Sequence, residues 1–339
     1  MRATSTMLLA VALVASLSVE ALAGDSSLKI SGFVDGGYSF TRTRSGTSWT
    51  NANTFSVNQV ELDIEKRLSK NFLVRADLNY LAGGPDPSTA LGLLDHAVEQ
   101  AFVKAMVQFG KWELFGQIGK FNAPIGWESQ DAPDKLEISQ SLLFANGGPT
   151  NLTGLMVGVQ SEYLSISLYL VNGWDQLSDP NKDKTFGASV TATVSFFAMA
   201  LGVITGKGVG GMNPAFDNER LTVFDANFTF KLLDSKMVIG LWGNFGFGSG
   251  GEAASKKWYA GQLTLHYMPI NYFGFTARYA LFYDKDGLKG LGVKQTEGAT
   301  IALITKPLDS VRFIVEYRAD MSAGRLMGHT VAFQGMLQY

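Results

Sequence analysis

Apolar and polar residues alternate in many short stretches of this chain. Between Val60 and Glu65, branched apolar residues alternate with acidic ones. The same period of two runs through residues 72–80, 164–170, 224–231 and 311–319. Single charges between large apolar residues do not fit a helical stripe, whose period is 3.6. The pattern therefore predicts β-strands with one wet face and one apolar face.

The alternation predicts sixteen strands, most of them long enough for the roughly 9–11 residues that a tilted strand needs to cross a bilayer. The expected spans are 28–41, 53–67, 71–82, 97–109, 111–121, 152–162, 164–173, 185–196, 198–207, 219–232, 236–248, 256–268, 272–284, 294–306, 309–319 and 327–339.

The connections between these strands alternate between long and short, starting with a long one. All nine prolines fall in connections, as expected if every strand is a central strand of a closed sheet. Outer-membrane barrels have an even number of strands, short periplasmic turns and longer external loops. The expected fold is an all-β, antiparallel transmembrane β-barrel. A soluble β-sandwich would explain the alternation but not the rhythm of the loops.

The last residues carry an apolar stripe to the end of the chain. Val331, Phe333, Leu337 and Tyr339 share one face of the predicted final strand. We expect this face to contact lipid and the strand to close against the first one. Its alternating aromatic ending resembles the signal read by the barrel-assembly machinery, which would make that machinery a partner.

The amino terminus has the features of a signal peptide. Arg2 precedes an apolar stretch over 7–19, which is too short to span a bilayer as a helix. Small residues then precede Gly24, so we expect residues 1–23 to be removed by cleavage before Gly24 and residues 24–339 to form the barrel. The expected location is the bacterial outer membrane.

Composition excludes several classes of function. Only 17% of residues are charged, below the roughly 25% of ordinary soluble domains. The 28 basic and 30 acidic residues nearly balance, which argues against a nucleic-acid partner. There is no cysteine. No group of histidines and acids has metal-ligand spacing, and the glycine-rich stretch 206–211 is followed by Asn213-Pro214 instead of a helix. We expect no cofactor.

Three segments resemble the OmpL-like β-barrel porins, and more loosely the phosphate-selective porins. They are "ISGFVDGGYSF", "NQVELDIEKRLSKNFLVRADLNY" and "GKFNAPIGWE", which ends at Glu128. The resemblance implies an outer-membrane channel. Sixteen-strand porins usually form trimers, so a homotrimer is an expected partner state, although the sequence marks no trimer face.

The third external connection, over 122–151, is the longest. Loops of this length are usually functional or disordered, and in 16-strand barrels the third loop commonly folds inward. An inward loop with these carboxylates would favour cations or neutral solutes over phosphate; an external loop with solvated carboxylates is an equally weighted alternative. The residues expected at the constriction are Lys120, Pro124, Gly126, Trp127, Glu128, Asp131, Asp134 and Glu137.

Charged residues on the polar face of the strands would line the pore. Porin walls often oppose a basic ladder to an acidic loop, but Arg75 is better explained by pairing with Glu61 and Asp63 across the second hairpin. The residues expected to line the pore are Glu61, Asp63, Arg75, Asp77, Lys104, Asp225, Lys231, Arg278, Arg312, Glu316 and Arg318.

The expected function is passive diffusion of small hydrophilic solutes or ions through a water-filled barrel narrowed by the inward third loop, without enzymatic turnover. The first alternative is an occluded barrel with a structural or surface-binding role. The second is a membrane hydrolase that would use His96, which has a much weaker basis.

Overall fold

In the computed structural model, the described residues are 28–81, 97–179, 181–207, 214–216 and 218–339. The expected signal peptide, most of the second external loop and His96 lie outside them. The strands are β1 (Leu28–Ser45), β2 (Ser48–Ser69), β3 (Phe72–Leu81), β4 (Val98–Phe109), β5 (Trp112–Asn122), β6 (Asn151–Gln160), β7 (Leu164–Val171), β8 (Thr185–Val194), β9 (Phe197–Lys207), β10 (Arg220–Leu232), β11 (Met237–Ser249), β12 (Lys257–Ile270), β13 (Phe273–Tyr283), β14 (Gln295–Leu308), β15 (Val311–Ser322) and β16 (Arg325–Gln338).

The helical segments with described bounds are short and lie in the external loops. They are η2 (Ala132–Asp134), α3 (Leu142–Asn146), η3 (Pro214–Phe216) and η4 (Gly251–Ala253). In the described part of the chain, no helix is long and apolar enough to cross a membrane.

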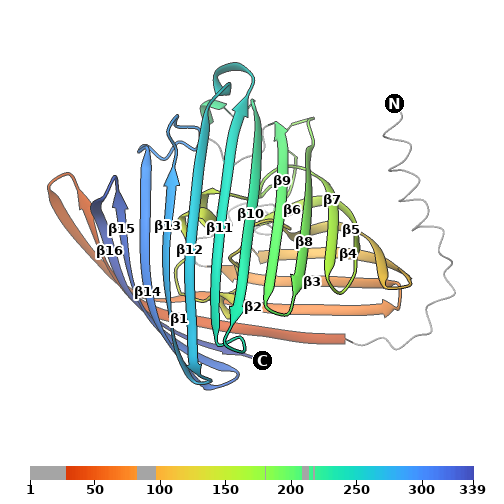
Figure 1. Ribbon diagram of the computed structural model, residues 1–339, viewed down its shortest axis with the longest axis horizontal. Coiled ribbons are helices and arrows are strands. Elements are labelled where there is room, and N and C mark those ends of the chain that lie inside the picture. Colours follow the sequence, from red (N-terminus) through yellow and green to blue (C-terminus); the bar gives the residue numbers. More distant parts are fainter. Residues whose placement is uncertain (1–27, 82–96, 180, 208–213, 217) are drawn as a thin grey trace.

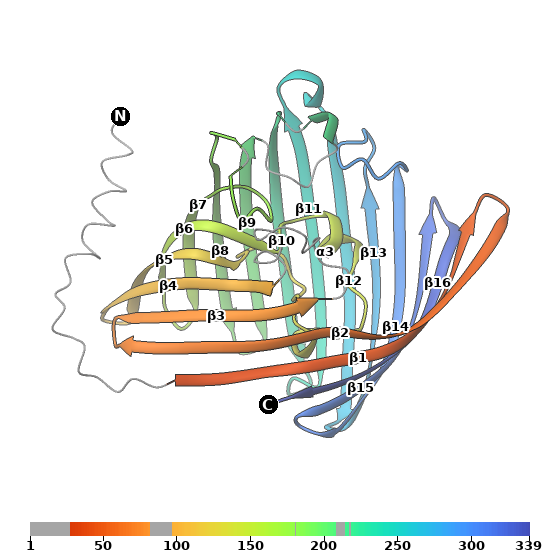
Figure 2. The same cartoon turned by 180° about the vertical axis from the view of Figure 1, so that it is seen from behind.

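The strands form one closed antiparallel barrel in which each strand pairs with its neighbours in sequence and β1 pairs with β16 (Figures 1 and 2). The closing register runs from Phe33 opposite Gln338 to Thr43 opposite Gly328. Every predicted strand is present and in the predicted order. Closure leaves the sheet without an open edge, which a bilayer requires.

Two external connections are shorter than the sequence predicts. Residues 42–52, expected as a loop, continue the ladder of β1 and β2 up to a turn at Gly46, whose φ is 62°. The last connection is a turn at Ala323 and Gly324, which both have positive φ. In both hairpins the polar residues that resemble a loop are strand residues extending toward the external side.

The prediction for proline is wrong at two positions. Pro269 and Pro307 lie within the last residues of β12 and β14, at places where the pairing register shifts. A proline is compatible with a strand there because the irregularity removes the need for its missing N–H donor.

The two faces of the wall differ as the alternation predicts. On β16, Phe333 is 46% exposed on the outer surface, whereas its neighbour Gln334 is 0% exposed inside the barrel. Val331, Leu337 and Tyr339 are exposed with Phe333. This confirms the apolar outer stripe on the final strand and its closure against β1.

The buried core lies inside the ring, between the wall and the external loops. The largest apolar cluster combines strand residues such as Phe121, Leu152 and Val223 with loop residues such as Ile125 and Trp174. The helix α3 also lies inside the ring, against β12, β13 and β14 (Figure 2). The third loop is therefore the element that the fold places in the lumen.

Candidate functional site

The third loop leaves the wall after Asn122, the last residue of β5, and returns at Asn151, the first of β6. Gly126 turns the chain with a φ of 98°, a conformation that favours glycine. Its N–H donates to Asp225 over 3.0 Å, and its carbonyl accepts from Asn227 over 2.9 Å. Both partners lie on β10, so the loop extends inward from β5 to a part of the wall five strands away.

Two large side chains of the loop lie flat against glycines in the wall. A Cβ added at Gly202 would overlap Ile125, and one added at Gly240 would overlap the indole of Trp127. The Trp127 Nε1–H also donates to Thr229 Oγ1 over 2.9 Å. Gly202 and Gly240 thus make room for these two side chains, as expected where a strand glycine marks close approach. We call these two glycines the seat of the loop. Neither glycine was predicted as a site residue.

Arg278 on β13 holds the middle of the loop. Its guanidinium lies 3.0 Å from a carboxylate oxygen of Glu128 and 3.6 Å from one of Glu137, and it donates to the carbonyl of Ser139 over 2.9 Å. Arg278 is 5% exposed, and its side chain meets both carboxylates away from bulk water. Two of the four predicted loop acids are therefore paired with one wall arginine.

Three further wall residues bind the backbone of the loop. Arg312 donates to the carbonyls of Pro133 and Lys135 at 3.1 and 2.8 Å, and also to that of Ala132. Glu316 accepts from the backbone N–H of Ile138 at 2.7 Å and of Ser139. Arg318 donates to the Gln140 carbonyl over 2.7 Å. The residues of β13 and β15 that were predicted to line the pore thus contact the loop.

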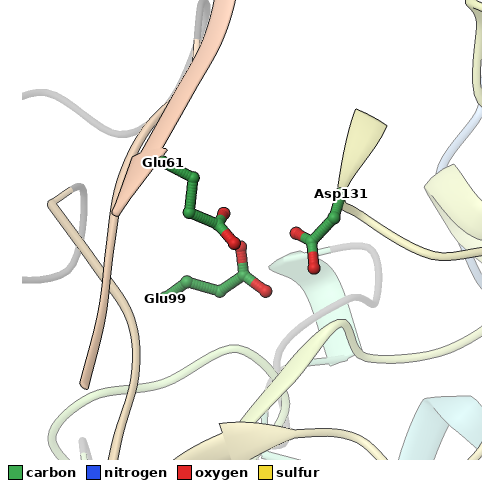
Figure 3. A group of neighbouring side chains, drawn as sticks. All are labelled: Glu61, Glu99 and Asp131. Atoms are coloured by element: carbon green, nitrogen blue, oxygen red, sulfur yellow. The ribbon is translucent and has the colours of Figure 1, made fainter. Parts of the chain in front are cut away.

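Three carboxylates meet where the loop crosses β2 and β4. Oxygens of Glu61, Glu99 and Asp131 all lie within 4.8 Å of one another (Figure 3). Burial, together with the charge of Glu99, raises the pKa of Asp131 to about 8. Among the described residues this group has the spacing that would admit a cation. Glu99 was not predicted as a site residue, although its place on the polar face of β4 was a signal.

The neighbourhood of Arg75 differs in part from the prediction. Its closest partner is Asp77 on the same strand, at 2.8 Å, and Asp63 lies 3.7 Å away across the hairpin. The expected pairing with Glu61 is wrong, because Glu61 faces Asn79 in the ladder and its carboxylate lies with Glu99.

The remaining predicted residues lie apart from this centre. Lys104 approaches Glu113 at 3.8 Å, and Lys231 is exposed at the periplasmic end of β10. Lys120 is in β5 and not in the loop; it is 7% exposed and within electrostatic range of Asp175. Pro124 lies two residues after Asn122, the last residue of β5.

A cavity of about 510 Å³ lies between the loop and the periplasmic ends of β1 and β15. A second cavity, of about 260 Å³, lies on the other side of the loop near Asn122 and Thr150. The loop separates these two spaces. The charged residues lining the larger cavity are Glu61, Asp63, Arg75, Asp131, Asp134 and Asp309.

A closed antiparallel barrel with an apolar outer face, a polar interior and a long loop crossing the lumen defines the porin class of bacterial outer-membrane channels. A family model described as "Putative beta-barrel porin-2, OmpL-like" matches residues 27–334, and the chain belongs to this family. It is a passive diffusion channel of the outer membrane. No curated protein matches the chain significantly.

Solved structures share the same fold. The outer membrane channel DcaP of Acinetobacter baumannii is 13% identical with a TM-score of 0.63, covering 93% of this chain and 97% of its own. An anion-selective porin from Comamonas acidovorans is 10% identical with a TM-score of 0.65, covering 93% and 100%. The trimer form of OmpT of Vibrio cholerae is 11% identical with a TM-score of 0.56, covering 93% and 100%. Identities this low establish the fold alone.

Proposed function

We propose that this porin passes small hydrophilic solutes and prefers cations to anions. The observation that carries the proposal is the charge around the 510 Å³ cavity. Five carboxylates and one guanidinium line it, and that guanidinium is already bound by Asp77. A confined, one-signed lining raises the local concentration of counter-ions, because the low-dielectric wall focuses its field.

The wall arginines do not offset this acidic lining. Arg278 is paired with loop carboxylates, and Arg312 and Arg318 donate to loop carbonyls. Arg278 and Arg312 are each 5% exposed, so their charges have little access to a passing anion.

The loop carboxylates contribute less to selectivity than the sequence suggests. Glu128 and Glu137 share Arg278, and the raised pKa of Asp131 keeps that carboxyl group mostly protonated at neutral pH. Asp134 and Asp309 face the cavity from the loop and a periplasmic turn, and Asp63 faces it from the wall, where it shares the Arg75 guanidinium with Asp77. These three carboxylates therefore supply most of the field.

A homotrimer and recognition by the barrel-assembly machinery are part of the same proposal. The trimer form of the Vibrio cholerae relative supports the first. The exposed aromatic ending of β16, with Phe333 and Tyr339 on its outer face, supports the second.

One observation favours a second candidate, a barrel closed on its external side. Trp174, Phe216, Ala253 and Leu288 come from four different external loops and are buried in one cluster with Trp258. The Lys289 Nζ lies 4.6 Å from the centre of the Trp174 ring and 5.4 Å from that of Trp258. These loops converge within the mouth and could shut it.

The test is single-channel conductance of refolded residues 24–339 in a planar bilayer under a salt gradient. The proposal expects discrete steps and a cation-biased reversal potential, which moves toward zero in Asp63→Asn/Asp134→Asn/Asp309→Asn. The matched control, Glu162→Gln/Asp183→Asn/Glu252→Gln, removes as many charges from exposed turns and should keep the bias.

Two results would overturn the proposal. An anion bias in the wild type, or a cation bias unchanged by the triple substitution, would show that the cavity carboxylates do not select. A folded barrel without conductance would favour the closed form, and loosening the mouth with Leu288→Ala should then restore current.

A further inference from the structure

The outer face of the barrel becomes basic and aromatic at the external end of the β1–β16 seam. Phe40 lies opposite Val331 on this face, and the next outward pair is Arg42 opposite His329. The side chains of Thr41 and Thr330, between these pairs, contact each other on the inner side at 3.0 Å. Arg42 and His329 therefore face the surroundings of the barrel, one step above its apolar band.

Trp49 organises the cations of this patch. Arg44 lies opposite Trp49 in the ladder, and its guanidinium carbon is 5.9 Å from the centre of the indole ring. The guanidinium carbon of Arg42 lies 5.0 Å from the same ring. The imidazole of His329 lies 6.2 Å from it, edge to face. Guanidinium groups stacked on an indole keep their N–H donors free at the rim.

In the described part of the chain, no acidic residue pairs with these two arginines. Segments 36–58 and 321–339, which form the upper β1–β2 hairpin and β16, contain no Asp or Glu. Among the described residues, no carboxylate lies within 4.0 Å of Arg42 or Arg44; the one side-chain hydrogen bond of Arg44 goes to the Gly46 carbonyl over 2.9 Å. Elsewhere in the wall, arginines such as Arg75 and Arg318 are paired with acids.

We propose that Arg42, Arg44, Trp49 and His329 form a binding site for the phosphate of an outer-leaflet lipid headgroup. The apolar residues below, including Phe40 and the 84% exposed Phe55, would contact the acyl chains. The position of the patch along the barrel wall supports a lipid over a soluble partner, because the patch begins where the apolar band ends. Guanidinium N–H groups match phosphate oxygens in geometry and in charge.

The test compares two lipids that differ only in phosphate. The folded barrel in neutral detergent is titrated with lipid A and with dephosphorylated lipid A, and bound lipid is counted by native mass spectrometry. A basic residue near an anionic lipid surface contributes roughly fivefold in affinity. We therefore expect Arg42→Gln/Arg44→Gln to weaken lipid A binding roughly 30-fold and to leave dephosphorylated lipid A unaffected.

A control variant, Lys285→Gln/Lys294→Gln, removes two exposed charges from the seventh external loop and should bind lipid A as the wild type does. Arg42→Lys/Arg44→Lys should retain part of the affinity, because charge remains while the planar geometry is lost. The proposal would be overturned if the wild type bound the two lipids equally. It would also be overturned if Lys285→Gln/Lys294→Gln lost as much lipid A affinity as Arg42→Gln/Arg44→Gln. A change of oligomeric state in the Arg42→Gln/Arg44→Gln variant without a change in lipid binding would overturn it too, because the patch would then be a contact between copies.

Discussion

Gly240→Ala should release the third loop from its seat. In the folded barrel the added methyl would lie 2.6 Å from Cη2 and 2.7 Å from Cε2 of Trp127, and closer still to Cζ2. Carbon atoms in good contact lie about 3.5–4.0 Å apart, so the ring must move by about 1 Å. The hydrogen bond from Trp127 Nε1 to Thr229 resists that movement.

The expected cost of this change is about 1–3 kcal/mol for overpacking, and losing the Trp127–Thr229 hydrogen bond would add about 1 kcal/mol. The strand ladder is unaffected, so the cost falls on the contact between Trp127 of the loop and the wall. A cost of 1–3 kcal/mol raises the population of the released loop roughly fivefold to 150-fold.

The assay is tryptic cleavage after Lys135 in the folded barrel, followed by mass spectrometry of the fragments. Lys135 is inside the lumen, where its Nζ donates to the Ile138 carbonyl over 3.2 Å. Cleavage reports the opened population when opening is fast. Current fluctuations in a planar bilayer provide a second reading, because a released loop moves within the conduction path.

Gly261→Ala is the matched control, since Gly261 lies on the adjacent strand β12 with nothing within 4 Å of an added Cβ. It should cleave at the wild-type rate. The reasoning about the seat is refuted if Gly240→Ala and Gly261→Ala show the same cleavage rate and the same current fluctuations.

Two other predictions concern the same loop. Arg278→Gln leaves Glu128 buried without its cation and should lower the free energy of unfolding, measured in urea, by about 3–5 kcal/mol. Adding Glu128→Gln should recover part of that loss. A double variant as unstable as the single one would contradict the pairing. Burial raises the pKa of both Asp131 and Glu137 to about 8. The folded state therefore binds their protons more tightly than the unfolded state, so protonation of these two groups stabilises the fold. This stabilisation is complete below about pH 4 and is lost as the pH rises through 8. Cleavage after Lys135, normalised to a peptide substrate, should therefore be faster at pH 9 than at pH 6; Asp131→Asn should reduce this dependence, and a flat wild-type profile would exclude it.

The strands were predictable from the sequence because their signal is local. An alternation such as that of 60–65 appears within one strand, and closure then follows from the even count and the apolar ending. The errors at 42–52 and at the last hairpin have a local cause too. Small polar residues resemble a loop when no membrane requires their outer face to be apolar, although their backbone continues the ladder.

The partners of the third loop were not predictable in this way. Its length and acidity marked it as a candidate, but the residues that hold it are far away in sequence, as Gly126 and Asp225 illustrate. A charge on the polar face of a strand looks the same whether it borders water or binds a loop. Arg312 therefore appeared to line a pore, whereas it donates to the backbone of the loop.

The position of the loop also constrains the order in which the barrel can be built. The loop belongs to the first half of the chain, but Asp225, Arg278, Arg312 and Glu316, which hold it, all belong to the second half. Contacts between such distant parts form late, since the chain between them must first be ordered. An assembling barrel therefore has an unfilled interior until its last strands arrive, and narrowing the lumen and completing the wall become a single event.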